Sequence, residues 1–565
     1  MPRRSVFWAI ALLATAAAAW QAWALRWTCD DAYISFRYAQ HFVEGHGLVF
    51  NRDPGEAPVE GYTNFLWTLW LALGMRLGCT GDAIETWSIA WGVACHAGTV
   101  LLLAGIAWRA SGGQARVPIA ACGYAALHHA ASLAPAGLET ALFVLLVTAM
   151  LRSVVVGEGP RGALLAGALG VLAAMTRPDG ALFAAVVGGF VLHDAWRYRA
   201  WKIVPAYAAP FVLVFVPYLL WRHSYYGLWV PNTFYAKSAG DPYPGQGLLY
   251  VWEFAKCYWV LLPVALVPLL GVLRRGDVPP SPWLAGARPW LAVLGFVVPY
   301  VAFVVWVGGD FMFGRFLLPV LPTLLLSLDV GCLRWRPAWA PMVGGLLVGG
   351  LVLRAEPAWL AVYDNPRGFS DNRAISVRDS GLGGPWTEVL RASGHYLHGV
   401  FRDLDVRIGI VGSQANLAYR SCVPVVIECT TGLTDARLGR QPVGVRGTPG
   451  HEKGYAAHLD YLIRERRLQL MFDLDFKKGE PHRDIVFPAI PGRLVTYDRV
   501  LLRELKERDP NITFDDFEQV LDRYLAELPN KTKEQVAADY EAFRSFYFDH
   551  NDDGPRRARF EEFLK

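Results

Sequence analysis

Apolar residues gather in long runs over the first two thirds of the chain. A helix needs about 20 mostly apolar residues to cross the roughly 30 Å hydrocarbon core of a bilayer. Eleven runs approach that length, at residues 5–26, 86–108, 116–134, 138–152, 161–175, 181–196, 202–221, 249–273, 289–307, 315–333 and 338–355. The pattern predicts a polytopic α-helical membrane protein of about 11 transmembrane helices, with its transmembrane domain over residues 1–355.

One further apolar segment, residues 64–78, is shorter, and we interpret it as an interfacial or re-entrant helix. The charge pattern supports this interpretation. With 64–78 left out of the count, the basic residues of alternate loops lie on the side of Arg3 and Arg4, which the positive-inside rule makes cytoplasmic. Those loop residues are Arg109, Arg116, Arg152, Arg161, Arg197, Arg199, Lys202, Arg274, Arg275, Arg288, Arg334 and Arg336.

The outer side then receives the loops that are rich in polar and aromatic residues, beginning with segment 27–85. It also receives the tail from about residue 356. The first apolar run ends in Ala22-Trp23-Ala24, which imitates a signal-peptidase site. Because that run is long enough to span a bilayer, we expect it to remain as the first helix.

The tail, residues 356–565, has a different composition with many more charged residues. A helical run near 387–398 is followed by two strand-like runs, 406–411 and 423–427, with a helix expected between them. Such alternation predicts a small α/β layer. Residues 515–547 read as amphipathic helices. We therefore expect a soluble, non-cytoplasmic C-terminal α/β domain.

Composition narrows the function further. The chain has 565 residues, is 53% hydrophobic and carries a net charge of only +4 without a basic stripe, so nucleic acid is not an expected partner. No phosphate-binding or dinucleotide glycine pattern and no nucleophile elbow occurs, which disfavours nucleotide and organic cofactors. Eight cysteines form no CxxC pair. Cys422 and Cys429 have the option of pairing in an oxidising compartment, although two thiols on one strand seldom reach disulfide geometry.

Two adjacent carboxylates, Asp30 and Asp31, follow the first apolar run. Paired carboxylates at the edge of a membrane are costly, and such residues usually have a function. A carboxylate beside an apolar wall has a raised pKa and accepts a proton from a sugar hydroxyl. We expect a catalytic pair here, with Asp31 also a candidate ligand of a divalent cation. Helix capping is the alternative, but one Asp suffices for a cap.

The rest of this outer loop mixes aromatic, amide and charged side chains, as expected for the floor of a sugar pocket at the membrane surface. An interfacial aromatic belt is the alternative. The candidate pocket residues are Arg37, Tyr38, His46, Glu60, Tyr62 and Asn64, joined from later outer loops by His129, Glu139 and Asp310. His128, His129 and Glu139 lie in one outer turn and are candidates for binding a metal or the acceptor, with an ordinary hydrogen-bonding role for the histidines as the alternative.

Three basic residues, Arg177, Lys237 and Arg315, lie in outer loops, against the positive-inside rule. A phosphate held at the membrane surface would explain them, through charge-assisted hydrogen bonds. Each taken alone is better explained by contact with lipid headgroups, but three together favour the phosphate. A separate acidic run, residues 549–554, imitates the start of a calcium loop, but Phe560 replaces the closing Glu, and we interpret the run as a solvated turn.

Several segments resemble those of C-type glycosyltransferases, and more closely those of the terminal arabinofuranosyltransferases of bacterial cell-wall arabinan. The similar segments are residues 30–38, 45–51, 59–67, 137–140, 176–180, 231–237, 308–319 and 432–435. The resemblance implies a GT-C-like fold in a bacterial inner membrane, with the tail in the periplasm. It also implies that Asp30 is the catalytic carboxylate, that Asp31 supports it or binds a cation, and that the outward basic residues hold the donor phosphate. Asn232 would line the sugar pocket together with His46, Glu60, Tyr62 and Asn64.

The resemblance further implies a polyprenyl-phosphate sugar as donor, with decaprenyl-phosphoryl arabinofuranose expected, and a cell-surface glycan or glycoprotein as acceptor. Membrane lipids are the other expected partners. Two functions of other classes remain open. A transporter or flippase of polyprenyl-linked sugars would need polar residues at the middle of the bilayer and repeated halves, neither of which the sequence shows. A scaffold whose tail binds wall polymer would not need Asp30.

Overall fold

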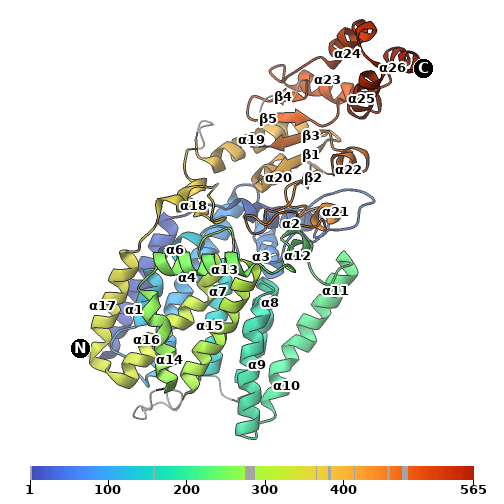
Figure 1. Cartoon of the computed structure of the whole chain (residues 1–565). Helices are drawn as coiled ribbons and strands as arrows, with labels where there is room; N and C mark the ends of the chain where they lie inside the picture. The colour runs from blue at the N-terminus through green and yellow to red at the C-terminus, as the bar shows by residue number, and fades with distance from the viewer. Residues whose placement is uncertain are drawn as a thin grey trace.

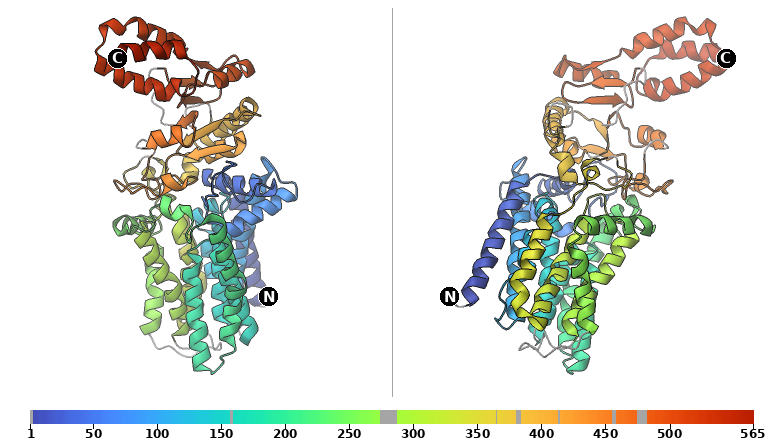
Figure 2. Two further views of the ribbon diagram at one scale, coloured as in Figure 1. Left: turned by 90° about the vertical axis from the view of Figure 1, so that its right-hand side faces the viewer. Right: turned by 60° about the vertical axis from the view of Figure 1, so that its left-hand side comes forward.

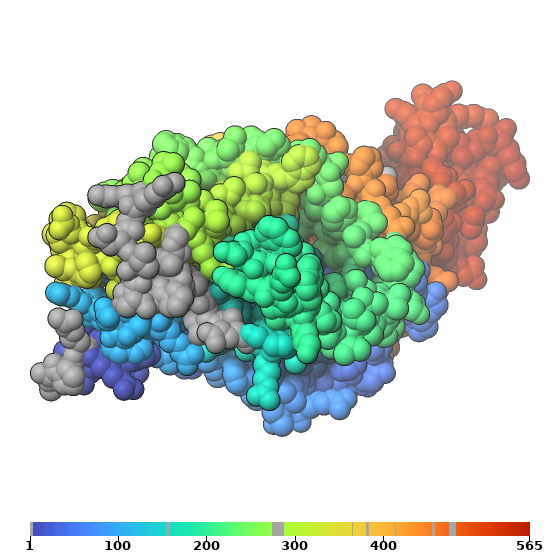
Figure 3. Space-filling view, turned by 90° about the horizontal axis from the view of Figure 1, so that it is seen from below, coloured from blue at the N-terminus to red at the C-terminus, as the bar shows by residue number. Residues whose placement is uncertain are grey.

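The structure is a computed structural model that describes residues 3–156, 159–273, 287–363, 365–379, 384–412, 414–454, 458–473 and 482–565. Arg274 and Arg275, used above for topology, lie outside these residues. A bundle of long helices fills one half of the molecule and the tail stands at one end of it (Figures 1 and 2). From the opposite end, the C-terminal helices project beyond the outline of the bundle (Figure 3).

Apolar sequence, interrupted at glycine and proline, sets the helices of the bundle. They are α1 (Arg3–Ala24), α4 (Ala83–Ala110), α5 (Ile119–Ala125), α6 (His128–Leu133), α7 (Thr140–Val156), α8 (Gly159–Thr176), α9 (Gly180–Arg197), α10 (Ile203–Pro210), η1 (Phe211–Phe215), α11 (Val216–Tyr226), α13 (Pro244–Cys257), α14 (Leu261–Leu273), α15 (Arg288–Val307), η3 (Arg315–Val320), α16 (Leu321–Trp335) and α17 (Ala340–Val352).

The expected count of eleven spans is not confirmed. Six described helices are long and apolar enough to cross a membrane, or seven if α13 and α14, which bend by 105°, form one span. The expected span 116–134 breaks at Leu127, whose extended conformation separates α5 from α6. Two others, α7 and α17, are apolar but shorter than the rest. Local hydropathy does not register such breaks, because a short kinked helix and a long straight one can have the same composition.

Exposed apolar surface on the bundle supports a multi-pass membrane protein. Leu213 and Leu220, on the continuous helical stretch η1–α11, are 73% and 57% exposed. An apolar face this open in water would be an association surface, whereas lipid tails cover it without cost. By contrast α3 (Phe65–Arg76) has 12 residues and is about 18 Å long, too short to span. It lies with α2 (Asp30–Val43) at the tail end of the bundle (Figure 1).

The tail contains the expected α/β layer. Its elements begin with α18 (Asn372–Ser376), α19 (Trp386–Phe401), β1 (Arg407–Val411), α20 (Ala415–Ser421), β2 (Val425–Glu428), α21 (Ala436–Gly439), α22 (Leu459–Arg464), β3 (Leu470–Asp473), β4 (Asp484–Val486), β5 (Pro491–Leu494) and β6 (Thr513–Phe514). The sheet order is β2-β1-β3-β5-β4-β6. β1 pairs in parallel with β2 and β3, with Ile408 opposite Val426, and the remaining pairs are antiparallel.

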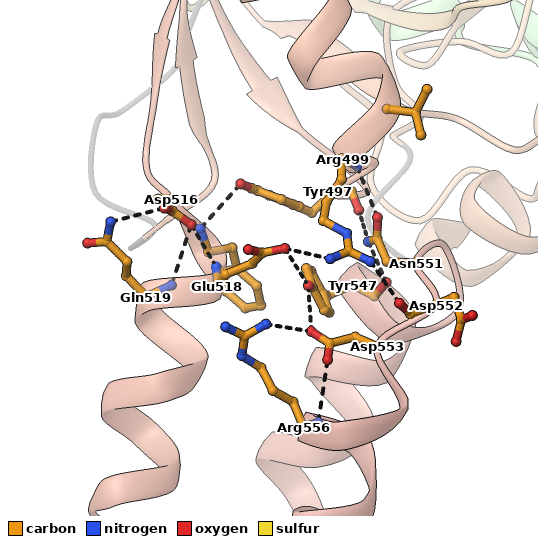
Figure 4. Close-up of polar contacts among 12 residues, drawn as sticks. Tyr497, Arg499, Asp516, Glu518, Gln519, Tyr547, Asn551, Asp552, Asp553 and Arg556 are labelled. Atoms are coloured by element: carbon orange, nitrogen blue, oxygen red, sulfur yellow. Dashed lines mark hydrogen bonds and ion pairs between the residues drawn. The ribbon is translucent and has the colours of Figure 1, made fainter.

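The last helices form a separate layer above the sheet: α23 (Arg499–Arg508), α24 (Phe517–Ala526), α25 (Lys533–Phe543), η8 (Arg544–Phe548) and α26 (Gly554–Leu564). The calcium-like turn lies here (Figure 4). Asp553 accepts hydrogen bonds from the Tyr547 hydroxyl and Arg556 Nη1, both at 2.8 Å, and caps α26. Asn551 donates to the carbonyls of Tyr497 and Tyr547. Helix capping and hydrogen bonds to neighbouring segments thus account for these side chains.

Candidate active site

The acidic pair opens helix α2 at the end of the bundle that faces the tail. Cys29 is extended, and α2 begins at Asp30. The Asp30 carboxylate accepts the N–H of Ala415 at 2.8 Å and that of Asn416 at 2.9 Å, which belong to the first turn of α20. Burial raises the pKa of Asp30 to about 7, although these two hydrogen bonds oppose the shift. Asp30 therefore joins α2 to the tail by capping a helix from another part of the chain.

Asp31 is in a different position. None of the described residues forms a hydrogen bond or an ion pair with its carboxylate. Its charge nevertheless acts on two neighbours. Burial raises the pKa of Cys29 and the negative charge of Asp31 adds to that increase, while the same charge favours the protonated form of His451 in the tail. The Asp31 carboxylate is thus half-buried, close to the tail, and has free acceptor oxygens.

Lys237 and His451 lie against the same aromatic ring. The Nζ of Lys237 is 5.6 Å from the centre of the Phe311 ring, and the His451 imidazole meets the same ring edge-on at 4.7 Å. The pKa of His451 is lowered first by burial and then by the charge of Lys237. Within the described part of the chain, Lys237 makes no salt bridge. A carboxylate and an ammonium group, neither of them in an ion pair with a described residue, therefore both act on the His451 imidazole.

The two outward arginines are already neutralised. Arg315 donates two hydrogen bonds to the Asp310 carboxylate, one of them from Nη2 at 3.0 Å. Arg177 pairs with Asp179 at 2.9 Å and with Glu139 at 3.6 Å. Both guanidinium groups lie over the Phe316 ring, at 4.7 Å for Arg177 and 5.5 Å for Arg315. An incoming phosphate would have to compete with these carboxylates for either arginine.

Two smaller groups hold other expected pocket residues. Asn64 donates to Glu139 at 2.9 Å, which connects it to the Arg177 pair. Glu60 accepts Arg222 Nε at 2.7 Å, and burial raises the pKa of Glu60 to about 7 despite this cation. The Tyr62 hydroxyl is 3.3 Å from that of Tyr226. His46 is on the rim of a cleft of about 810 Å³ between the first outer loop and the tail.

Three expected pocket residues instead attach chain segments to one another. Arg37 is fully buried and donates to the carbonyls of Phe50, Ala418 and Val423 at 2.5–2.7 Å. Tyr38 donates to the Val59 carbonyl and accepts the Gly61 N–H. Asn232 donates to the carbonyls of Gly432 and Leu433, both at 2.9 Å. Their polar atoms serve the contact between the outer loops and the tail.

His129 lies apart from the acidic pair, in α6. Its Nδ1 is 2.6 Å from the Tyr258 hydroxyl, and it has no contact with Glu139 among the described hydrogen bonds. Cys422 and Cys429 are both free thiols. The expected residues therefore divide into an acidic–basic centre, a set of buried ion pairs, a set of docking contacts and one isolated histidine.

Sequence reasoning missed several residues that shape this region. His451 and Glu428 come from the tail, and Arg420 forms a salt bridge from α20 to Glu85 at the start of α4. Arg222, the partner of Glu60, ends an apolar helix where snorkelling to headgroups would have been the ordinary interpretation. No local pattern marks the tail residues, because their partners lie up to several hundred positions away in the chain.

Comparison with known proteins supports the resemblance drawn from the sequence. No protein-family model matches the chain. The chain is 31% identical over 345 residues to the terminal β-(1→2)-arabinofuranosyltransferase of Mycobacterium tuberculosis, covering 55% of this chain and 53% of that protein. It is 30% identical over 353 residues to the enzyme of the same name from Corynebacterium glutamicum, covering 57% and 50%. The resemblance to this group of enzymes is confirmed, and the chain spans about half the length of the curated relatives it matches.

Among solved structures, the archaeal oligosaccharyltransferase AglB from Archaeoglobus fulgidus, determined with an inhibitory peptide and a dolichol-phosphate, superposes with a TM-score of 0.46. The sequences are 10% identical, and the match covers 82% of this chain and 69% of that one. A likeness of this degree is too remote to carry a functional statement.

Proposed function

We propose that the chain is an integral-membrane glycosyltransferase that moves a sugar from a lipid-linked phosphate to a hydroxyl group of a glycan or protein. The similarity to two arabinofuranosyltransferases supports the reaction class. One observation carries the assignment of the site: Lys237 and His451 lie against the same Phe311 ring, at 5.6 Å and 4.7 Å, and the charge of Asp31 acts on that imidazole. Neither Asp31 nor Lys237 forms an ion pair with a described residue. Uncommitted charges of opposite sign are expensive to maintain in a half-buried space, and a substrate that uses both would explain them.

In the proposed reaction, the acceptor oxygen forms a bond to the anomeric carbon while the bond from that carbon to the phosphate oxygen breaks. The phosphate leaves with the electron pair, and the hydroxyl proton passes to the Asp31 carboxylate. Lys237 offsets the negative charge on the departing phosphate. The sequence pointed to Asp30 as the base. We assign the role of base to Asp31. Asp30 instead holds α20 in place, because both of its carboxylate oxygens already accept amide hydrogens.

We propose a polyprenyl-phosphate pentose as donor, with arabinofuranose as the first sugar to test, because the relatives are named for that sugar. The site is at the tail end of the bundle, where a lipid phosphate at the membrane surface would lie beside Lys237. We further propose that this end faces the outside of the plasma membrane. Basic residues in the loops at the opposite end, such as Arg109 and Arg334, support that orientation.

A divalent cation at Asp31 fits the described residues poorly. Asp30 is engaged by two amides, and the carboxylate of Glu428 accepts backbone N–H groups from Thr430, Thr431 and Leu433. The neighbouring Lys237 would also repel a cation. Among the described residues, the one cluster of three potential ligands close enough for an ion does not include Asp31. No step of the proposed reaction is therefore routed through a metal.

The test is turnover of the purified full chain with decaprenyl-phosphoryl arabinofuranose and a panel of other polyprenyl-phosphate sugars. Release of the carrier phosphate and formation of glycoside are measured together. Asp31→Asn is expected to lower turnover about 10²–10⁴-fold, the usual contribution of a general base, and Lys237→Met to lower it as well. The matched control is Glu44→Gln, which replaces a carboxylate at the far end of α2 by a neutral amide and should retain activity.

Turnover of Asp31→Asn close to that of Glu44→Gln would remove Asp31 from the mechanism. If no donor in the panel yields a glycoside while the carrier lipid crosses the bilayer of reconstituted vesicles, the transporter alternative replaces the transferase. A reporter fused after residue 565 tests the orientation, because the proposal requires the tail to lie outside the cytoplasm.

A further inference from the structure

A second polar cluster lies away from the acidic pair, where the bundle meets the start of the tail. It brings together His129 of α6, Glu356 just after α17, and Asp371, which caps α18. One ligand atom from each of the three residues lies within 4.8 Å of the other two. His129 is far from the other two in the chain, and no motif in the sequence connects the three.

His129 provides an independent reason to look for a ligand. It is only 2% exposed, and its Nδ1 is held by the Tyr258 hydroxyl at 2.6 Å. Its other ring nitrogen, Nε2, is buried without a hydrogen-bond partner among the described residues. A buried polar atom without a partner lowers stability, so such an atom points to a missing ligand. With Nδ1 engaged by the Tyr258 hydroxyl, Nε2 is the ring nitrogen that remains for a ligand.

Each carboxylate also retains an available oxygen. Asp371 uses Oδ1 to accept the N–H groups of Arg373 and Ala374, and Oδ2 has no described partner. Glu356 uses Oε2 to pair with Arg354 at 2.8 Å, and Oε1 has none. Asp371 is 8% exposed, whereas Glu356 lies at the surface. The cluster therefore offers one nitrogen and two carboxylate oxygens, with one open side.

We propose that His129, Glu356 and Asp371 form a binding site for a divalent transition metal ion, with Zn²⁺ as the expected occupant. Mg²⁺ and Ca²⁺ prefer ligand sets made only of oxygen, while an imidazole with two carboxylates suits Zn²⁺. Tyr258 would act as the outer partner that fixes the orientation of the imidazole, as is usual for metal-bound histidines. Bonds of about 2.0–2.2 Å require the ligands to move closer together, and the surface position of Glu356 allows this.

The site would hold the tail against the bundle next to the acidic–basic centre. Ser370, one residue before Asp371, accepts the Phe313 N–H and donates its own N–H to the Phe311 carbonyl, both at 2.9 Å. The His129 ring packs edge-on against Phe313 at 5.0 Å. A metal ion at His129 and Asp371 would therefore fix the loop that carries Phe311. This inference does not depend on the glycosyltransferase assignment.

The experiment is Zn²⁺ titration of the full chain in detergent by calorimetry, after removal of any affinity tag and treatment with a chelator. We expect one equivalent of Zn²⁺ to bind, with Ca²⁺ binding far more weakly. His129 is buried and its replacement risks misfolding, so the carboxylate variants carry the test. Glu356→Gln and Asp371→Asn should each weaken Zn²⁺ binding roughly tenfold or more. The Asn side chain retains an oxygen that can cap α18.

Arg354→Gln provides a change in the opposite direction. It removes the cation that occupies one oxygen of Glu356, so we expect tighter Zn²⁺ binding, which a misfolded variant would not produce. Glu388→Gln, an exposed carboxylate in α19, is the control and should bind as the parent does. Absence of saturable Zn²⁺ binding, or equal affinity in the parent, Glu356→Gln and Asp371→Asn, would overturn the proposal. Weaker binding in Arg354→Gln would also count against it.

Discussion

Arg420 is the residue whose replacement most directly tests how the tail is held on the bundle. Its side chain is 1% exposed, and it forms salt bridges with Glu85, which is 9% exposed, and with Asp82, which is 52% exposed. Removing one partner of a buried ion pair typically costs about 3–5 kcal/mol, because the other charge stays buried. An exposed partner adds at most about 1 kcal/mol.

The remaining contacts of Glu85 reduce this cost. After Arg420→Met, Glu85 would still accept hydrogen bonds from Thr28 at 3.1 Å and from Arg391 at 3.0 Å. We therefore expect a loss near the lower bound, about 3 kcal/mol in the free energy of docking the tail. Since every 1.4 kcal/mol is a factor of ten, amide exchange in α20 and α2 should become about a hundredfold faster.

Hydrogen exchange of the intact chain, followed by mass spectrometry, measures the amide exchange rate of α20 and α2 in separate peptides. Arg437→Met is the matched control, because its pair with Glu465 is exposed on both sides (54% and 62%) and should contribute under about 1 kcal/mol. The double variant Arg420→Met with Glu85→Gln removes both charges and should exchange more slowly than the single variant. Exchange in Arg420→Met within about threefold of the parent would refute the reasoning, since it corresponds to well under 1 kcal/mol.

Two further predictions concern other contacts between the outer loops and the tail. The pKa of Asp30 is about 7 in the folded protein, above its ordinary value of 3.8. Between these two pH values the folded state therefore holds a proton that the unfolded state has lost. The stability that this proton provides is complete below pH 3.8 and is lost as the pH rises toward 7. The neutral variant Asp30→Asn does not lose this stability. The difference in melting temperature, variant minus parent, should therefore be larger at pH 8 than at pH 5. A difference that does not change with pH would contradict the assignment. Asn232→Ala removes the donor shared by the Gly432 and Leu433 carbonyls and should destabilise the chain by about 1–3 kcal/mol; an unchanged melting temperature would argue that water replaces the amide.

Some residues of the site were predictable because charged side chains are unusual at their positions in a membrane protein. Adjacent carboxylates after an apolar run, and basic residues in outer loops, stand out because membranes penalise charge. They pointed to Asp31 and Lys237, and the charges of both act on His451 of the tail. The same reasoning did not distinguish Asp30 from Asp31, because the two are identical in type and neighbours in sequence. The amides of Ala415 and Asn416, which occupy Asp30, are about 385 positions away.

The sequence by itself determined the membrane character, the helical bundle, the α/β tail and the collection of polar loops at one end, because these follow from local hydropathy and periodicity. Only the tertiary structure decided which charges are free. Arg177 and Arg315 are paired with Asp179 and Asp310, whereas Lys237 is not paired within the described chain. Asp179 and Asp310 are only two and five positions from these arginines, so the sequence permits both pairs. Whether the side chains meet depends on the packing around them, which the order of residues along the chain does not settle.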